Sequence, residues 1–186
     1  RSIRVIAFAN EEQGLHGGSA YAAAMKADVD KHQLGAESDF GAGRVYALQG
    51  GVDEKSWPVL EQVGKILEPL GIVVDKTNGG PGPDIGAMAA QGMPWAELAQ
   101  DGTDYFDYHH TANDTLDKID PKALDQQVAA YAVLAYLAAE TDVDFDIKSK
   151  NVLLGSADWL FDKKITKEIS KNARFEMASY IDSAKI

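Results

Sequence analysis

Short apolar segments of strand length alternate with longer segments of helical character along the first 140 residues of the chain. The strand-like segments are rich in β-branched and apolar residues and are bounded by turn residues; they are Ile3–Ala9, Leu34–Phe40, Arg44–Leu48, Ile72–Val74 and Met93–Leu98. The helical segments are alanine-rich or carry apolar residues three or four positions apart; they are Gly17–Lys31, Asp53–Glu68 and residues 121–140. Such alternation predicts an α/β three-layer sandwich, with helices on both faces of a largely parallel mixed sheet.

The two longer helices have recognisable boundaries. Pro69 cannot continue the first of them, and Gly71 completes its end. Asp120 and Pro121 are a cap residue and a first-turn proline, so they predict the start of a helix that runs to about Glu140. The sequence therefore predicts one structured unit over residues 1–141.

The pattern changes in the tail, residues 142–186. Val152–Leu154 has the character of a strand and Lys163–Ile181 that of a helix. We assign no function to this tail from its sequence.

Composition excludes several classes of function. The net charge of −11 argues against binding to nucleic acid, which requires a basic surface. No apolar run approaches the roughly 18–20 residues of a membrane-spanning helix. The chain has no cysteine, so it contains neither a disulfide nor a thiolate metal ligand. Any bound metal must therefore be held by His, Asp or Glu.

An acidic pair, Glu11 and Glu12, follows the first predicted strand. Adjacent side chains on a regular strand point to opposite faces, but a turn near Gly14 would let both serve one site. One carboxylate could bind a metal while its neighbour accepts a proton from water. The alternative is a pair of solvated acids in a surface turn.

Two further polar segments follow predicted strands. Asp39 lies in a turn flanked by glycine, where a cap or turn residue is the plain alternative. His109 and His110 lie in a polar loop with aromatic neighbours, and imidazole is a preferred nitrogen ligand of zinc. A half-buried histidine without a metal is the alternative there. Because ligand sites of α/β sheets lie at the carboxyl ends of strands, we expect the three segments to converge.

Taken together, these segments resemble the co-catalytic zinc aminopeptidases of metallopeptidase family 28, and within that family the carboxypeptidase-Q-like branch. The likeness covers about residues 3–140 and rests on a specific combination of short motifs. The motifs are Glu11-Glu12–x–Gly14-Leu15–x–Gly17, Glu37-Ser38-Asp39, Gly79–Ile85, and His109-His110-Thr111–x–x–Asp114-Thr115 within the stretch from Asp101-Gly102 to Asp120-Pro121.

The resemblance implies a zinc-dependent exopeptidase, an aminopeptidase or dipeptidase that hydrolyses peptide bonds with a metal-activated water. It implies that Glu11 is the general base, that Glu12 and His110 ligate one zinc ion, and that Asp39 ligates a second. It further implies a peptide substrate, and it favours a periplasmic or secreted location. The oligomeric state and the preferred substrate residue stay open.

Two more residues receive roles from the resemblance, and one motif of the family has no counterpart. His109 and Asp114 are implied to orient the histidine loop. The family's other histidine ligand and its bridging aspartate lie in a His–x–Asp motif on an earlier strand, and nothing similar occurs in Arg1–Asn10. We therefore expect this chain to be the later part of a longer catalytic domain.

Two alternatives stay open. A glutaminyl-cyclase-like transferase shares the implied fold and similar ligands but uses a single zinc ion; Asp39 as a second-metal ligand argues against it. A non-catalytic, peptidase-like interaction domain would retain the fold without the chemistry. The presence of Glu11, Glu12, Asp39 and His110 disfavours that alternative, whereas the missing His–x–Asp motif keeps it open.

Overall fold

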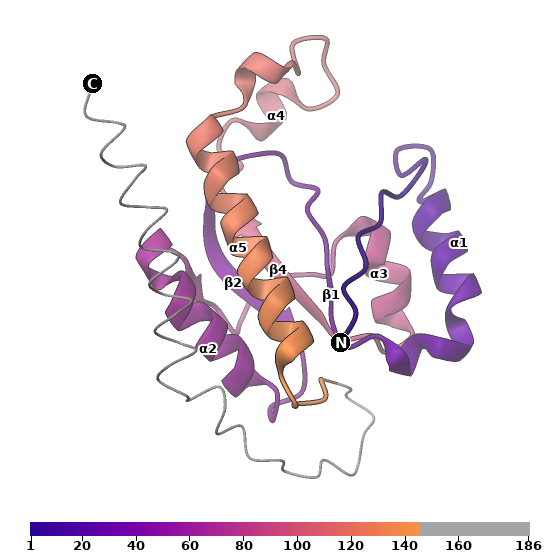
Figure 1. Cartoon of the computed structure of the whole chain (residues 1–186). Coiled ribbons are helices and arrows are strands. Elements are labelled where there is room, and N and C mark those ends of the chain that lie inside the picture. The colour runs from indigo at the N-terminus through magenta and orange to yellow at the C-terminus, as the bar shows by residue number, and fades with distance from the viewer. Residues whose placement is uncertain (146–186) are drawn as a thin grey trace.

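The computed structural model describes residues 1–145, so the predicted strand at Val152–Leu154 and helix at Lys163–Ile181 lie outside the described residues. Within residues 1–145, Figure 1 shows a sheet flanked by helices. The sheet has four strands in the order β1-β4-β2-β3. They are β1 (Gly35–Ala36), β2 (Val45–Gly51), β3 (Val73–Val74) and β4 (Trp95–Gln100).

The α-helices of the described chain are α1 (His16–Ala24), α2 (Trp57–Leu67), α3 (Pro83–Ala90), α4 (Tyr105–Tyr108) and α5 (Pro121–Glu140). Three short 3-10 helices join them, η1 (Lys26–Lys31), η2 (Glu68–Leu70) and η3 (Leu116–Lys118). Asp120 caps α5 as predicted, because its side chain accepts a hydrogen bond from the backbone N–H of Lys122. No helix in residues 1–145 is both long enough and apolar enough to cross a bilayer.

The sheet is mixed. β1 runs parallel to β4, and β3 runs parallel to β2. The longest ladder is antiparallel and joins β2 to β4, from Val45 opposite Gln100 to Gly51 opposite Trp95. The α/β fold predicted from the sequence is therefore confirmed, with an antiparallel pair at the centre of the sheet.

The larger hydrophobic core lies between this sheet and the pair α2 and α5 (Figure 1). Leu60 of α2, Leu134 of α5 and Leu48 of β2 are almost completely buried there, and Phe145 closes the core after α5. Each such side chain contributes roughly 1.5–3 kcal/mol by leaving water. This core fixes α5, and α5 in turn contacts the segment that contains Asp39.

A smaller core joins α1 to α3 beside the β1 edge of the sheet (Figure 1). Ala22 of α1 packs there with Ile85 and Met88 of α3. The two helices approach very closely at Gly18, where an added Cβ would lie 2.2 Å from the carbonyl oxygen of Asp84. Only glycine permits this approach, which places the N-terminal turns of α1 and α3 side by side.

The prediction of a strand at Ile3–Ala9 was wrong, because this segment lies outside the sheet. Val5 is 94% exposed and Ile3 57% exposed. Within residues 1–145 no other strand forms a ladder with the segment, so its β-branched pattern lacks the partner that strand structure requires. Its C-terminal end is nevertheless fixed, since the N–H of Gly17 donates to the carbonyl of Ala9 (2.8 Å).

A polar network joins the same segment to α1 and η1. The Arg4 guanidinium donates to the Tyr21 hydroxyl (2.6 Å), and that hydroxyl lies 2.8 Å from Nε2 of His32. The other ring nitrogen of His32, Nδ1, faces the carbonyl of Asp28 at 3.0 Å. Because a carbonyl only accepts, Nδ1 carries a hydrogen and donates to Asp28, while the Tyr21 hydroxyl contacts the other ring nitrogen.

Candidate active site

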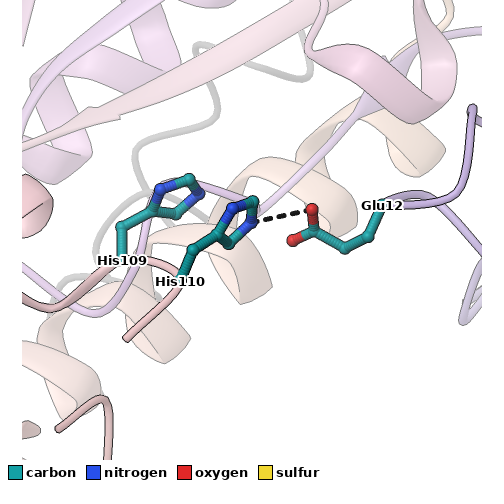
Figure 2. Close-up of side chains that lie close together, drawn as sticks. All are labelled: Glu12, His109 and His110. Atoms are coloured by element: carbon teal, nitrogen blue, oxygen red, sulfur yellow. Dashed lines mark ion pairs between the residues drawn. The ribbon is translucent and has the colours of Figure 1, made fainter. Parts of the chain in front are cut away.

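Two loops that are distant in sequence bring Glu12 and His110 together. Glu12 lies in the turn before α1, where the N–H groups of Gly14 and Leu15 both donate to the carbonyl of Glu11. His110 follows α4. Figure 2 shows the His110 ring and the Glu12 carboxylate facing each other, with Nε2 2.8 Å from Oε2. The convergence expected from the sequence is present for this pair.

Both loops contain a non-glycine residue in the left-handed region of backbone space. Asn10 has φ 56°, directly before the acidic pair, and His110 itself has φ 59°. This conformation is uncommon for side-chain-bearing residues, although Asn and His tolerate it better than most. Strained backbone of this kind clusters at functional sites. In this chain it turns the backbone at the two places where the facing side chains emerge.

A row of stacked rings supports the histidine side of the pair. The His109 and His110 rings stack with centroids 3.7 Å apart, and His109 also stacks on Tyr105 at 4.7 Å. Tyr105 in turn stacks on Phe40 at 4.2 Å. Since Phe40 directly follows Asp39, the row connects the histidine loop to the Asp39 segment.

The side chains of Glu12, His109 and His110 fit a metal ion. One carboxylate oxygen and one ring nitrogen from each histidine all lie within 4.8 Å of one another (Figure 2). Nitrogen and carboxylate oxygen donors in this combination suit zinc. His109 was expected only to orient the loop, yet its ring lies in the same group as the two predicted ligands.

Glu11 is half-buried beside this group. Its partial burial raises the pKa of its carboxyl, and the negative charges of Glu12, Asp39 and Asp84 raise the pKa further, against an opposing effect of His110. A raised pKa makes the carboxylate a stronger base, which is the direction that a general base requires.

Asp39 and Asp114, the remaining predicted residues, are exposed at the margin of the site. The charge of Asp39 raises the pKa of Glu11 and of Asp84, which places it in the same acidic field, but it lies outside the group of three possible ligands. Asp114 lies in the histidine loop. Burial raises the pKa of the Tyr105 phenol most, and the charges of Asp39, Glu12 and Asp114 raise it further.

The structure adds two acidic residues that sequence reasoning assigned no role. Glu37 is half-buried, and burial raises the pKa of its carboxyl even though two backbone N–H groups bond to it. Asp84 is 9% exposed, and its Oδ1 is buried without a hydrogen-bond partner. Burial and the nearby charge of Asp39 raise the pKa of Asp84. Glu37 belongs to the motif Glu37-Ser38-Asp39, and Asp84 belongs to the motif Gly79–Ile85.

The fold and these side chains define an α/β protein with an acidic, histidine-containing site at converging loops. The chain belongs to Peptidase family M28, whose family model matches residues 1–137. A second family model, described as a domain of unknown function (DUF4403), matches residues 141–186.

Relatives support this assignment over the same part of the chain. Carboxypeptidase Q of Mus musculus is 34% identical over 142 residues, and that of Homo sapiens is 33% identical. A solved structure, the Peptidase M28 precursor from Shewanella amazonensis SB2B, matches with 46% identity and a TM-score of 0.71 over 74% of this chain. The chain spans only 30% of the mouse protein and 31% of the Shewanella chain.

Proposed function

We propose that residues 1–141 are the later part of the catalytic domain of a zinc-dependent exopeptidase that hydrolyses peptide bonds. The observation that carries the proposal is the meeting of Glu12 and His110 at 2.8 Å, with His109 beside them and Glu11 adjacent. Membership of Peptidase family M28 supports it. The relatives named carboxypeptidase Q support a hydrolase acting on peptides.

In this proposal Glu12 and His110 would hold one zinc ion, and Asp39 would contribute to a second. Bound zinc lowers the pKa of water and polarises a carbonyl oxygen. His109 would keep the His110 ring in place by stacking, and its own ring nitrogen is a further possible donor. Asp114 would help to order the loop that presents both histidines.

Glu11 would act as the general base. Its carboxylate would accept the proton of the attacking water and return it to the nitrogen of the leaving amine. The raised pKa of Glu11 supports this role. The surrounding acids, Asp39 and Asp84, would also attract the positively charged amino terminus of a peptide.

The test is zinc content and peptide hydrolysis, measured on this chain and on a version that is extended upstream. We expect Glu11→Gln to abolish hydrolysis while zinc stays bound, and His110→Ala to lose zinc. Glu54→Gln is the matched control, because Glu54 is an exposed glutamate between β2 and α2; it should change neither hydrolysis nor zinc binding. Hydrolysis by Glu11→Gln within a few-fold of the wild type would refute the assignment of the base.

Peptides blocked at one end would define the type of exopeptidase. Cleavage that requires a free amino terminus would indicate an aminopeptidase, and cleavage that requires both free ends would indicate a dipeptidase. Cleavage that requires only a free carboxyl terminus would indicate a carboxypeptidase.

A single-zinc transferase of the glutaminyl-cyclase type is the second candidate. The three possible ligands found within residues 1–145 converge on one position, and Asp39 is not among them. One zinc per chain in the extended protein, together with cyclisation of an N-terminal glutamine, would favour this candidate. Two zinc ions and peptide hydrolysis would favour the exopeptidase, and no zinc in either version would indicate a non-catalytic interaction domain.

A further inference from the structure

The segment that carries Asp39 is held by α3 on one side. The two carboxylate oxygens of Glu37, two residues before Asp39, accept separate hydrogen bonds from the first turn of α3. Oε1 accepts from the N–H of Asp84 (3.1 Å) and Oε2 from the N–H of Ile85 (3.0 Å). The first N–H groups of a helix have no partner within the helix, and a negative charge at this end is favourable. Glu37 therefore acts as the cap of a helix to which it does not belong.

α5 holds the same segment from the other side. The hydroxyl of Tyr131 donates to the backbone carbonyl of Glu37, and the amide of Gln127 donates to the hydroxyl of Ser38 (2.7 Å). Gln127 is buried and Tyr131 is half-buried. Because Gln127 is buried, removing the hydroxyl to which its amide donates would leave that amide without its partner.

The backbone near α3 is shaped to admit the Glu37 carboxylate. Gly82, the residue before α3, has φ 89°, and a Cβ added there would lie 2.5 Å from Oε2 of Glu37. Any other residue would therefore be strained and would also collide with the carboxylate. The contacts of Glu37 thus depend on a glycine at this position.

We propose that Glu37 is a positioning residue that fixes Asp39 for cation binding. Its hydrogen bonds hold the end of β1 against α3 and α5. Asp39, two residues after Glu37, is thereby kept near Glu11 and the histidine loop. This inference rests on the proposed metal-binding function of Asp39. Glu37 itself touches neither substrate nor metal.

A double-mutant cycle tests the proposal on the version of the chain that is extended upstream. Zn²⁺ affinity is measured by titration calorimetry for the wild type, Glu37→Gln, Asp39→Asn and the double variant. In Glu37→Gln only one of the two helix N–H groups can keep an acceptor. We expect this variant to lose about 10–100-fold in Zn²⁺ affinity, as is usual for groups that orient metal ligands. In the Asp39→Asn background the same substitution should have no further effect.

Glu97→Gln is the matched control. Glu97 also accepts a backbone N–H, that of Gly80 (2.8 Å), but it makes a single such bond that the glutamine carbonyl can replace. The Glu97→Gln variant should therefore bind Zn²⁺ with the affinity of the wild type. Tyr131→Phe removes one bond to the Glu37 backbone and keeps the ring, so it provides a milder variant if Glu37→Gln does not fold. Tyr131→Phe should also weaken Zn²⁺ binding, and only when Asp39 is present.

Backbone ¹⁵N relaxation on the metal-free chain separates failure of this inference from failure of the proposed function. We expect the amide of Asp39 to be rigid in the wild type and Glu97→Gln, and more mobile in Glu37→Gln or Tyr131→Phe. An equally rigid Asp39 in these variants would overturn the positioning role, as would an equal loss of affinity in both backgrounds of the cycle. Unchanged Zn²⁺ affinity in Asp39→Asn, with Asp39 mobile in Glu37→Gln, would instead refute the assignment of Asp39 as a metal ligand.

Discussion

Replacement of Gly18 by alanine tests the close approach of α1 to α3. The added Cβ would lie 2.2 Å from the carbonyl oxygen of Asp84, whereas ordinary contacts of a Cβ begin at 3.4 Å. Backbone atoms cannot swing aside as a flexible side chain can, so the two helices would have to separate. Overpacking of this kind costs about 1–3 kcal/mol.

Alanine also stabilises a helix relative to glycine, by about 0.5–1 kcal/mol, and this gain opposes the overpacking cost. Gly86 in α3 provides the matched control, since a Cβ added there meets nothing within 4 Å. Gly86→Ala should show the helical gain alone, whereas Gly18→Ala should be less stable than the wild type. The two variants should therefore differ by about 1–3 kcal/mol in free energy of unfolding.

Urea unfolding, followed by far-UV circular dichroism, measures this difference for the three chains. The midpoint should fall for Gly18→Ala and rise for Gly86→Ala, with an unchanged dependence on urea concentration, which would show that the same surface is exposed on unfolding. If Gly18→Ala were as stable as Gly86→Ala, the packing of α1 against α3 described above would be wrong.

Three further predictions concern single side chains. Burial raises the pKa of Tyr131 to about 12, so the unfolded chain loses this proton first and stability should fall as the pH rises from 10 toward that value. Tyr131→Phe should lessen this fall, measured as urea midpoints across the same pH range, and an unchanged fall would refute the prediction. Tyr21→Phe keeps the ring but leaves Nε2 of His32 unpaired, so the free energy of unfolding should decrease by about 1 kcal/mol; equal stability would contradict the network. Asp120→Ala should cost about 1 kcal/mol by removing the cap of α5, whereas the exposed Asp125→Ala should be neutral, and equal effects would contradict the cap.

Sequence reasoning succeeded for the fold where local signals and burial agree. Asp120 and Pro121 mark the start of α5 because capping is decided within one turn of helix. The segment Ile3–Ala9 has an equally clear strand pattern, and that prediction was wrong. A strand needs a neighbour to complete its hydrogen bonds, and the pattern within one segment contains no information about that neighbour.

The same distinction holds for the candidate site. The meeting of Glu12 and His110 could be predicted because their residue types both suit a metal, and the structure brings them to 2.8 Å; their role as ligands stays a prediction. The role of Glu37 could not be predicted, because it depends on the N-terminus of a helix far along the chain. The assignments of Glu11 as base and Asp39 as ligand stay predictions.

The row of stacked rings from Phe40 through Tyr105 and His109 to His110 has a consequence for when the site forms during folding. Its members come from two segments separated by β2, α2, β3, α3 and β4, so the row cannot assemble until most of the described chain has reached its place. Contacts between distant parts of a chain form slowly because their loop-closure entropy must first be overcome. A partly folded chain would thus lack the stacked rings that support His109 and His110, and the chemistry proposed for this site would be withheld until the row has formed.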